Sequence, residues 1–156
     1  MKPTWKEYDI EAWEHGVAGC SPQPGRPTDR FVFNDCGVCV NPHVLGLAAK
    51  TWRVGIYTAR NKRGRWVAGS DVSFPTAGHR RGALNVDADS FPEEWGARSM
   101  ELRRAAHWIE CYMNPEAVSC PIPGAQAREA LRLISQAIED IEPKRRPVFT
   151  QLSLFD

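Results

Sequence analysis

Trp52-Arg53-Val54-Gly55-Ile56-Tyr57-Thr58-Ala59 is the stretch that decides the fold class. The stretch contains two alternating sets of residues: one is Trp52, Val54, Ile56 and Thr58, and the other is Arg53, Gly55, Tyr57 and Ala59. A period of two is typical of a half-buried β-strand. Asn61-Lys62-Arg63-Gly64 supplies polar turn chemistry, and residues 66–74 are predicted as the return strand. Because an isolated hairpin is only marginally stable in water, we expect it to pair with other strands or to pack against helices.

The residues before this hairpin predict further strands and an irregular start. Phe31-Val32-Phe33 and Val38-Cys39-Val40 flank the predicted turn Asn34-Asp35-Cys36-Gly37. Residues 1–30 carry several prolines, which remove hydrogen-bond donors, so we predict an irregular N-terminal arm. Within it, residues 5–13 are expected to form either one short helix or an extended segment.

The residues after the hairpin predict a long loop and then two helices. Residues 75–98 are expected to be the loop, in which residues 82–86 can form a short strand. Ser99 is a suitable N-cap for the first helix, whose apolar face consists of Leu102, Ala105, Ala106, Ile109 and Met113. The second helix begins near Pro123-Gly124, carries an apolar stripe as far as Ile141, and is stopped by Pro143.

This order of strands followed by helices predicts an α+β fold. We expect a small antiparallel sheet with the two C-terminal helices packed on one face, followed by a flexible C-terminal tail. The predicted organisation is an irregular arm at residues 1–30, a single α+β domain at residues 31–142 and a flexible tail at residues 143–156.

Length and charge exclude several classes of protein. The 156 residues suit one compact domain. With 20 basic and 19 acidic residues, the net charge of +1 gives no overall attraction to nucleic acid or to a membrane. No apolar run is long enough to span a bilayer, and the N-terminus lacks the apolar stretch of a signal peptide, so we expect a soluble cytoplasmic protein with no membrane partner. In that compartment the five cysteines are expected to be thiols or metal ligands rather than disulfides.

The last residues, Gln151-Leu152-Ser153-Leu154-Phe155, place three large apolar side chains on a polar, proline-flanked segment. Such side chains are suited to filling a partner's groove. The alternative is that Leu152, Leu154 and Phe155 fold back onto the sheet as a final strand.

This pentapeptide resembles the motif by which bacterial polymerases, repair proteins and clamp loaders bind the sliding clamp. The family pattern is Gln, Leu, Ser or Asp, Leu, Phe, and the chain matches it from Gln151 to Phe155 at every place. The resemblance implies that Gln151 hydrogen-bonds at the edge of the clamp pocket and that the apolar side chains fill it. The Trp-rich hairpin, the helices and this ending also resemble small proteins encoded by phages, plasmids and other mobile genetic elements of bacteria.

A second candidate site is a zinc centre. Cys36, Cys39 and His43 have the spacing C-x2-C-x3-H, and Cys20 can supply a fourth ligand. The simpler alternative is that Cys36 and Cys39 are small residues of a hairpin, one buried and one exposed. No other cofactor is predicted.

A third candidate is a nucleic-acid contact at the hairpin tip. Four basic residues crowd the tip beside aromatic residues, and two more follow in the next loop: Arg60, Lys62, Arg63, Arg65, Arg80 and Arg81. Basic side chains beside aromatic rings can track a phosphate backbone and stack on bases. The alternative is a solvated turn that needs charge for solubility.

Catalytic constellations are not visible in the sequence. Asp87, Asp89, Glu93 and Glu94 form an acidic stretch that we interpret as a solvated loop. The leading hypothesis is therefore a non-enzymatic adaptor in DNA replication or repair that binds the sliding clamp, with DNA as a second candidate partner. The alternatives are a clamp-localised, nuclease-like DNA-processing enzyme and a small zinc-stabilised nucleic-acid-binding module.

Overall fold

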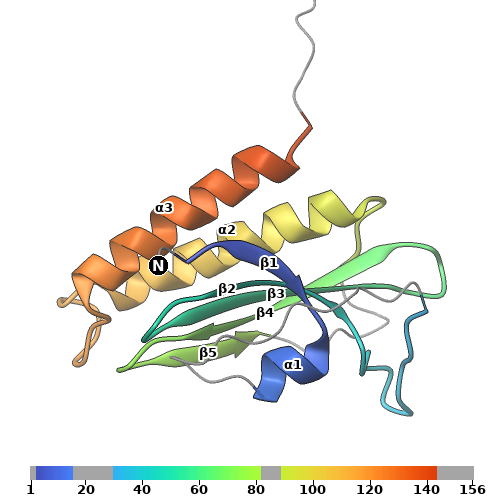
Figure 1. The fold of residues 1–156 in the computed structure, drawn as a ribbon, viewed down its shortest axis with the longest axis horizontal. Coiled ribbons are helices and arrows are strands. Elements are labelled where there is room, and N and C mark those ends of the chain that lie inside the picture. The colour runs from blue at the N-terminus through green and yellow to red at the C-terminus, as the bar shows by residue number, and fades with distance from the viewer. Residues whose placement is uncertain (1–2, 16–29, 82–88, 144–156) are drawn as a thin grey trace, which may run out of the picture.

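The computed structural model describes residues 3–15, 30–81 and 89–143. Its elements are β1 (Trp5–Tyr8), α1 (Ile10–His15), β2 (His43–Ala48), β3 (Arg53–Arg60), β4 (Trp66–Ser73), β5 (Gly78–Arg81), α2 (Glu94–Tyr112) and α3 (Gly124–Ile141). The strands form one five-stranded sheet in the order β1-β2-β3-β4-β5, with every neighbouring pair antiparallel. Helices α2 and α3 cover one face, and α1 lies on the other (Figure 1). The predicted α+β class and the placement of both long helices on one face are confirmed.

The predicted central hairpin is present as β3 and β4. Its register runs from Arg53 opposite Ser73 to Arg60 opposite Trp66. Strand β3 was expected to be half-buried, but it is buried along its whole length except at Arg60. The alternation therefore marks two different buried surroundings, one under the long helices and one under α1.

Two strands on one side of the hairpin differ from the expectation. Strand β2 was not predicted, because His43–Ala48 is buried on both faces apart from Ala48 and shows no polar alternation. The N-terminal arm was expected to be irregular, but β1 pairs with β2 from Trp5 opposite Leu47 to Tyr8 opposite Val44. The described part of residues 1–30 thus belongs to the sheet layer and to α1. The backbone hydrogen bonds of β1 come from its pairing with β2, and the sequence of residues 5–8 alone does not reveal this pairing.

The start of the first long helix was also predicted wrongly. Helix α2 begins at Glu94 with Glu93 as its N-cap, and no side chain caps it. Ser99 lies inside the helix, is buried, and donates a 2.5 Å hydrogen bond to Oε1 of Glu142. The suggested strand at residues 82–86 lies outside the described residues. Within the predicted loop, residues 78–81 form β5, which pairs with β4. The second helix begins at Gly124 and ends at Ile141, as predicted.

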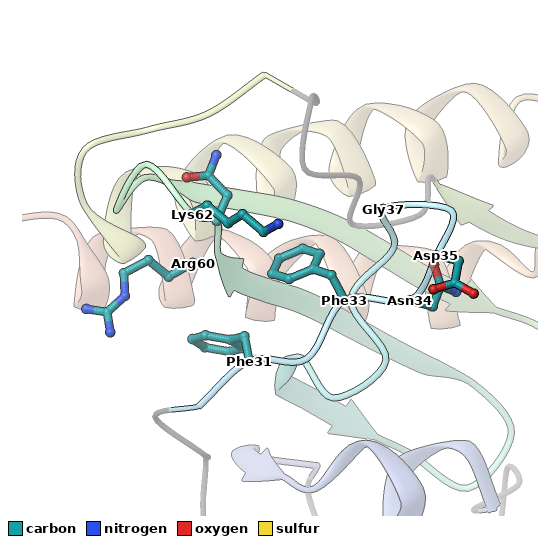
Figure 2. Close-up of a pocket in the computed structure, with 8 residues that line it drawn as sticks. Phe31, Phe33, Asn34, Asp35, Gly37, Arg60 and Lys62 are labelled. Atoms are coloured by element: carbon teal, nitrogen blue, oxygen red, sulfur yellow. The ribbon is translucent and has the colours of Figure 1, made fainter.

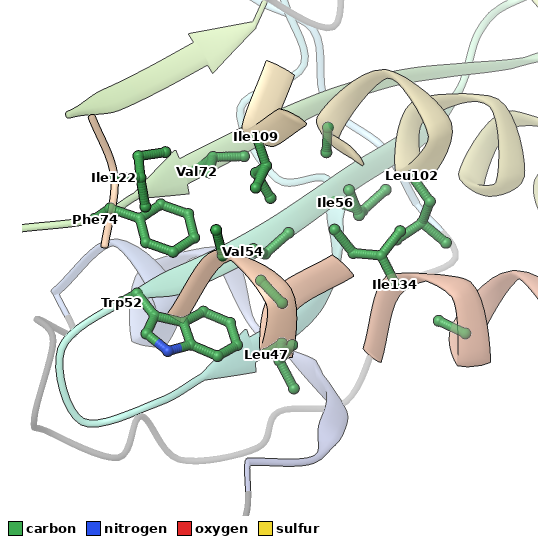
Figure 3. Packing of buried hydrophobic residues seen from close by; sticks show 14 of the residues in the cluster. Leu47, Trp52, Val54, Ile56, Val72, Phe74, Leu102, Ile109, Ile122 and Ile134 are labelled. Atoms are coloured by element: carbon green, nitrogen blue, oxygen red, sulfur yellow. The ribbon is translucent and has the colours of Figure 1, made fainter. Parts of the chain in front are cut away.

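The main core fills the space between the sheet and the two long helices (Figure 3). Its buried members come from β2, from the hairpin strands and the residues next to them, from both helices and from the α2–α3 connection: Leu45, Leu47, Trp52, Val54, Ile56, Val72, Phe74, Leu102, Ala105, Ile109, Ile122, Ala127, Ala130, Ile134 and Ala137. Burying each large aliphatic side chain contributes roughly 1.5–3 kcal/mol. This core holds β3 and β4 in place and so positions the loop at their tip.

The opposite face of the sheet is closed by Trp13 of α1. Its indole is fully buried and lies over Gly46 and Gly55, where there is no room for a side chain. The guanidinium of Arg53 lies 3.9 Å from the centre of the Trp13 ring and donates a hydrogen bond to the Trp13 carbonyl oxygen. These contacts fix α1 on the sheet, because a cation over an indole face is attracted by the ring quadrupole.

Within the residues that the structure describes, no helix combines the length and the apolar character needed to cross a membrane.

Candidate functional site

The strongest candidate site is a pocket between two turns that have the same hydrogen-bond pattern. In residues 34–38, the Asn34 side-chain oxygen accepts hydrogen bonds from the backbone N–H groups of Cys36 and Val38, both at 3.0 Å. The backbone closes the turn through Asn34 N–H to Val38 O at 2.8 Å and Gly37 N–H to Asn34 O at 2.9 Å. Gly37 has φ 77°, a conformation that glycine adopts without steric cost.

The hairpin tip repeats this pattern with Asn61 and Gly64. The Asn61 side-chain oxygen accepts from the backbone N–H of Arg63 at 3.0 Å and of Arg65 at 3.1 Å. The closing bonds are Asn61 N–H to Arg65 O at 2.8 Å and Gly64 N–H to Asn61 O at 3.0 Å, and Gly64 has φ 75°. An Asn side chain that satisfies the turn's own backbone donors makes both loops rigid before any ligand arrives.

The two turns frame a pocket of about 530 Å³. Its lining consists of Phe31, Phe33, Asn34, Asp35, Gly37, Arg60, Asn61 and Lys62. Arg60 and Lys62 lie on one side and Asn34 and Asp35 on the other, with the two phenylalanine rings between them (Figure 2). The pocket therefore combines flat apolar surface with two cations, one carboxylate and two amides.

Phe31 is held from behind by two other rings. Its centroid lies 4.8 Å from the ring of His43 and 5.7 Å from that of Trp66, which it meets edge to face. The Arg60 guanidinium lies 5.9 Å from the Trp66 ring centre. Aromatic contacts of this kind add about 0.5–1.5 kcal/mol each beyond area burial, so they stabilise one orientation of Phe31.

A polar network adjoins the aromatic group, which consists of Phe31, His43 and Trp66. Nδ1 of His43 is 2.7 Å from Oε2 of Glu94, and the Thr58 hydroxyl donates to the same oxygen at 3.3 Å. Arg98 lies 3.5 Å from the other oxygen of Glu94 and pairs with both oxygens of Glu7, at 2.7 and 3.0 Å. Glu94, expected in a solvated loop, is thus the first residue of α2 and joins the helix to β2 and β3.

The pKa of Glu94 lies below its ordinary value of 4.5. Burial alone would raise it, but the hydrogen bond with His43, the charges of Arg98 and His43, and the Thr58 hydrogen bond outweigh burial. The carboxylate is therefore held in its charged form, as a structural anchor for the aromatic group.

The six predicted nucleic-acid residues do not form one patch. Arg60 and Lys62 line the pocket, and Arg63 is exposed on the same turn. Arg65 instead donates to the hydroxyl and carbonyl oxygens of Ser90, at 2.9 and 3.0 Å, and fastens the segment before α2 to the hairpin.

Arg80 lies on β5, where it pairs with Glu14 at 3.3 Å and hydrogen-bonds to Tyr57 on the α1 side of the sheet. Arg81 ends β5 opposite Ser70, and its side chain lies outside the described residues. Of the predicted basic residues whose side chains the structure describes, Arg60 and Lys62 line the pocket.

The predicted zinc ligands are not brought together in the described part of the chain. Cys36 is exposed and Cys39 is buried, as the simpler alternative predicted. The Cys39 thiol donates to Oδ1 of Asn41 at 3.5 Å, while His43 faces Glu94. No three His, Cys, Asp or Glu side chains among the described residues are grouped to hold a metal ion, and Cys20 lies outside those residues.

Of the residues that line the pocket, sequence reasoning named only Arg60 and Lys62 as candidate site residues. Phe31, Phe33 and Asp35 were assigned only to strands and a turn, although the paired motifs Asn-x-x-Gly at 34–37 and 61–64 were visible. The predicted clamp-binding residues Gln151, Leu152, Ser153, Leu154 and Phe155 lie outside the described residues.

Comparison with known proteins identifies no relative. No protein-family model matches the chain, and no curated protein and no solved structure is significantly similar to it.

Proposed function

We propose that this protein is a non-enzymatic adaptor that binds the bacterial sliding clamp through Gln151–Phe155 and acts in DNA replication or repair. The observation that carries the proposal is the match of five consecutive residues to the clamp-binding pattern. With average residue frequencies, a chance match at any one position is on the order of one in several hundred thousand. A clamp partner also implies that the protein works in the cytoplasm.

The chemistry of the motif supports the proposal. Leu152, Leu154 and Phe155 each contribute roughly 1.5–3 kcal/mol when a partner's groove buries them. Ordering the peptide and losing rigid-body freedom offset much of this gain. We therefore expect a net binding free energy of about −8 kcal/mol, which corresponds to a micromolar Kd.

The architecture of the described domain is compatible with a separate binding peptide. Among the described residues, the last buried member of the main core is Ala137, on α3, which ends at Ile141. In the sequence, Pro143 and the polar run Lys144-Arg145-Arg146 separate α3 from the motif. This spacing supports a motif that a partner reads independently of the domain. The clamp-localised, nuclease-like enzyme and the zinc-stabilised module stay predictions.

Calorimetric titration of a bacterial sliding clamp with the full-length protein tests the proposal. The wild type is expected to bind with micromolar affinity, and a variant with Leu154→Ala and Phe155→Ala is expected to show no measurable binding. A matched control carries Val148→Ala and Phe149→Ala, which removes similar apolar groups from just before the motif. Equal loss in both variants, or no binding by the wild type, would contradict the proposal.

A further inference from the structure

We propose that the pocket between the turns at residues 34–38 and 61–65 binds one unpaired nucleotide of a single-stranded nucleic acid. A nucleotide presents an aromatic base, a phosphate anion and a polar base edge, and the pocket contains a matching group for each. The inference does not depend on clamp binding, because it concerns the folded domain and not residues 151–155.

The flat surfaces of Phe31 and Phe33 suit the base. Both rings are half-buried and line the pocket, so each keeps part of its surface accessible to a ligand. Stacking of a base on an aromatic ring tolerates every base, because each base has a π-face. Because His43 and Trp66 already hold Phe31 from behind, little side-chain entropy is lost when a base stacks there.

The two cations suit the phosphate. The side chains of Arg60 and Lys62 are exposed, and neither has a hydrogen bond or an ion pair with another residue in the described part of the chain. Arg63 adds a third exposed cation on the same turn. A phosphate can therefore pair with these groups without breaking an internal salt bridge, which favours charge-assisted hydrogen bonds.

Polar groups from both turns suit the base edge. The side-chain oxygens of Asn34 and Asn61 accept hydrogen bonds from the backbone N–H groups of their turns. The group that each amide can offer to a ligand is therefore Nδ2, a hydrogen-bond donor. Asp35 is exposed and supplies an acceptor for an exocyclic amine, as carboxylates do for cytosine N4. A carboxylate opposite two cations also disfavours a ligand that is only an anion, such as free phosphate.

An unpaired strand fits this arrangement better than a duplex. In a duplex both faces of each base are stacked on neighbouring bases, so Phe31 and Phe33 cannot reach them without unstacking. The turns are closed by their own hydrogen bonds and by glycines at positive φ, so both turns are formed without a ligand. We therefore expect a preference for single strands over the matching duplex.

The test is fluorescence anisotropy of a labelled mixed-sequence 15-nucleotide single strand with the full-length protein at 50 mM salt. Micromolar binding is expected, at least about tenfold tighter than to the matching duplex. The Phe33→Leu variant keeps apolar volume but removes the flat ring, and it should weaken binding by about 5-fold to 100-fold with an unchanged salt slope.

A charge variant tests the phosphate contacts separately. Arg60→Gln with Lys62→Gln should weaken binding and lower the slope of log affinity against log salt by about 1 to 1.5. The matched control, Lys50→Gln with Arg132→Gln, makes the same change of charge at exposed positions in the β2–β3 connection and on α3, and should bind almost as the wild type.

Three results would overturn the inference: no binding of the single strand at low salt, equal affinity for the duplex, or equal weakening by the two charge variants. Binding of adenosine monophosphate as tightly as the 15-mer would also overturn it, by showing a site for free nucleotides. The variant with Leu154→Ala and Phe155→Ala should bind the strand as the wild type does, so failure of this inference and failure of clamp binding are distinguishable.

Discussion

Nδ1 of His43, on β2, lies 2.7 Å from Oε2 of Glu94, the first residue of α2. The pair joins the start of β2 to the start of α2, and the imidazole ring packs on Phe31, which lines the pocket. A contact between residues that are far apart in the chain therefore fixes two things at once. It sets where α2 begins, and it supports the aromatic wall of the candidate site.

Removing the Glu94 charge should destabilise the protein in a manner that depends on pH. The pKa of Glu94 in the folded state is below its ordinary value of 4.5, so folding favours the charged carboxylate. The stabilisation is complete above about pH 4.5 and is lost as the pH falls through the lower folded pKa. Glu94→Gln should lower the free energy of unfolding by roughly 1.5–3 kcal/mol at pH 7 and by clearly less near pH 3.

Urea denaturation followed by Trp fluorescence at both pH values measures this difference. The control is Glu93→Gln, which neutralises the exposed neighbour just outside the helix and should change stability little at either pH. A Glu94→Gln effect of the same size at pH 3 and pH 7 would show that the carboxylate charge does not contribute.

Adding one methyl group at Gly55 should destabilise the fold. A Cβ at this position would lie 2.7 Å from the Trp13 indole, which is fully buried and cannot move aside cheaply. Gly55→Ala is expected to lower the free energy of unfolding by about 1–3 kcal/mol through overpacking. Gly96→Ala, in α2, is the matched control. Its Cβ would lie 3.8 Å from the Phe91 side chain, which is an ordinary van der Waals contact.

Thermal and urea unfolding distinguish these two glycine variants. Because alanine is a better helix former than glycine, Gly96→Ala should be neutral or stabilising by up to about 1 kcal/mol. If Gly55→Ala is as stable as the wild type, α1 is not packed on the sheet through Trp13.

The thiols of Cys36 and Cys39 should react at different rates. Burial raises the pKa of Cys39, against smaller lowering contributions from the backbone of Asn41 and Val32, whereas Cys36 is exposed. Since the thiolate is the nucleophile, iodoacetamide should label Cys36 at least about tenfold faster than Cys39. Peptide mapping by mass spectrometry measures both rates in the folded protein.

The same labelling experiment decides between the two predictions for these cysteines. A zinc centre would protect both thiols, and a chelator would then release both for reaction. Unequal rates that a chelator leaves unchanged would agree with a hairpin that has one buried and one exposed cysteine.

Local patterns determined several parts of this protein. The alternation from Trp52 to Thr58 identified the central hairpin, and Asn61-Lys62-Arg63-Gly64 identified its turn, because backbone and side-chain hydrogen bonds within five residues close it. The apolar stripe ending at Ile141, followed by Pro143, identified α3. Each of these features is encoded by residues that contact one another along a short stretch of chain, which is why the sequence alone reveals them.

Other parts were decided only by tertiary structure. Strand β2 carries no alternation because both of its faces are buried, and β1 is a strand because β2 offers it an edge. Ser99 has the chemistry of an N-cap, yet α2 extends back to Glu94 because His43 and Thr58 hold that carboxylate. The pocket exists because the sheet brings residues 31–37 beside the hairpin tip. Pairing and packing between distant segments leave no periodic signal in either one, so only the folded chain shows them.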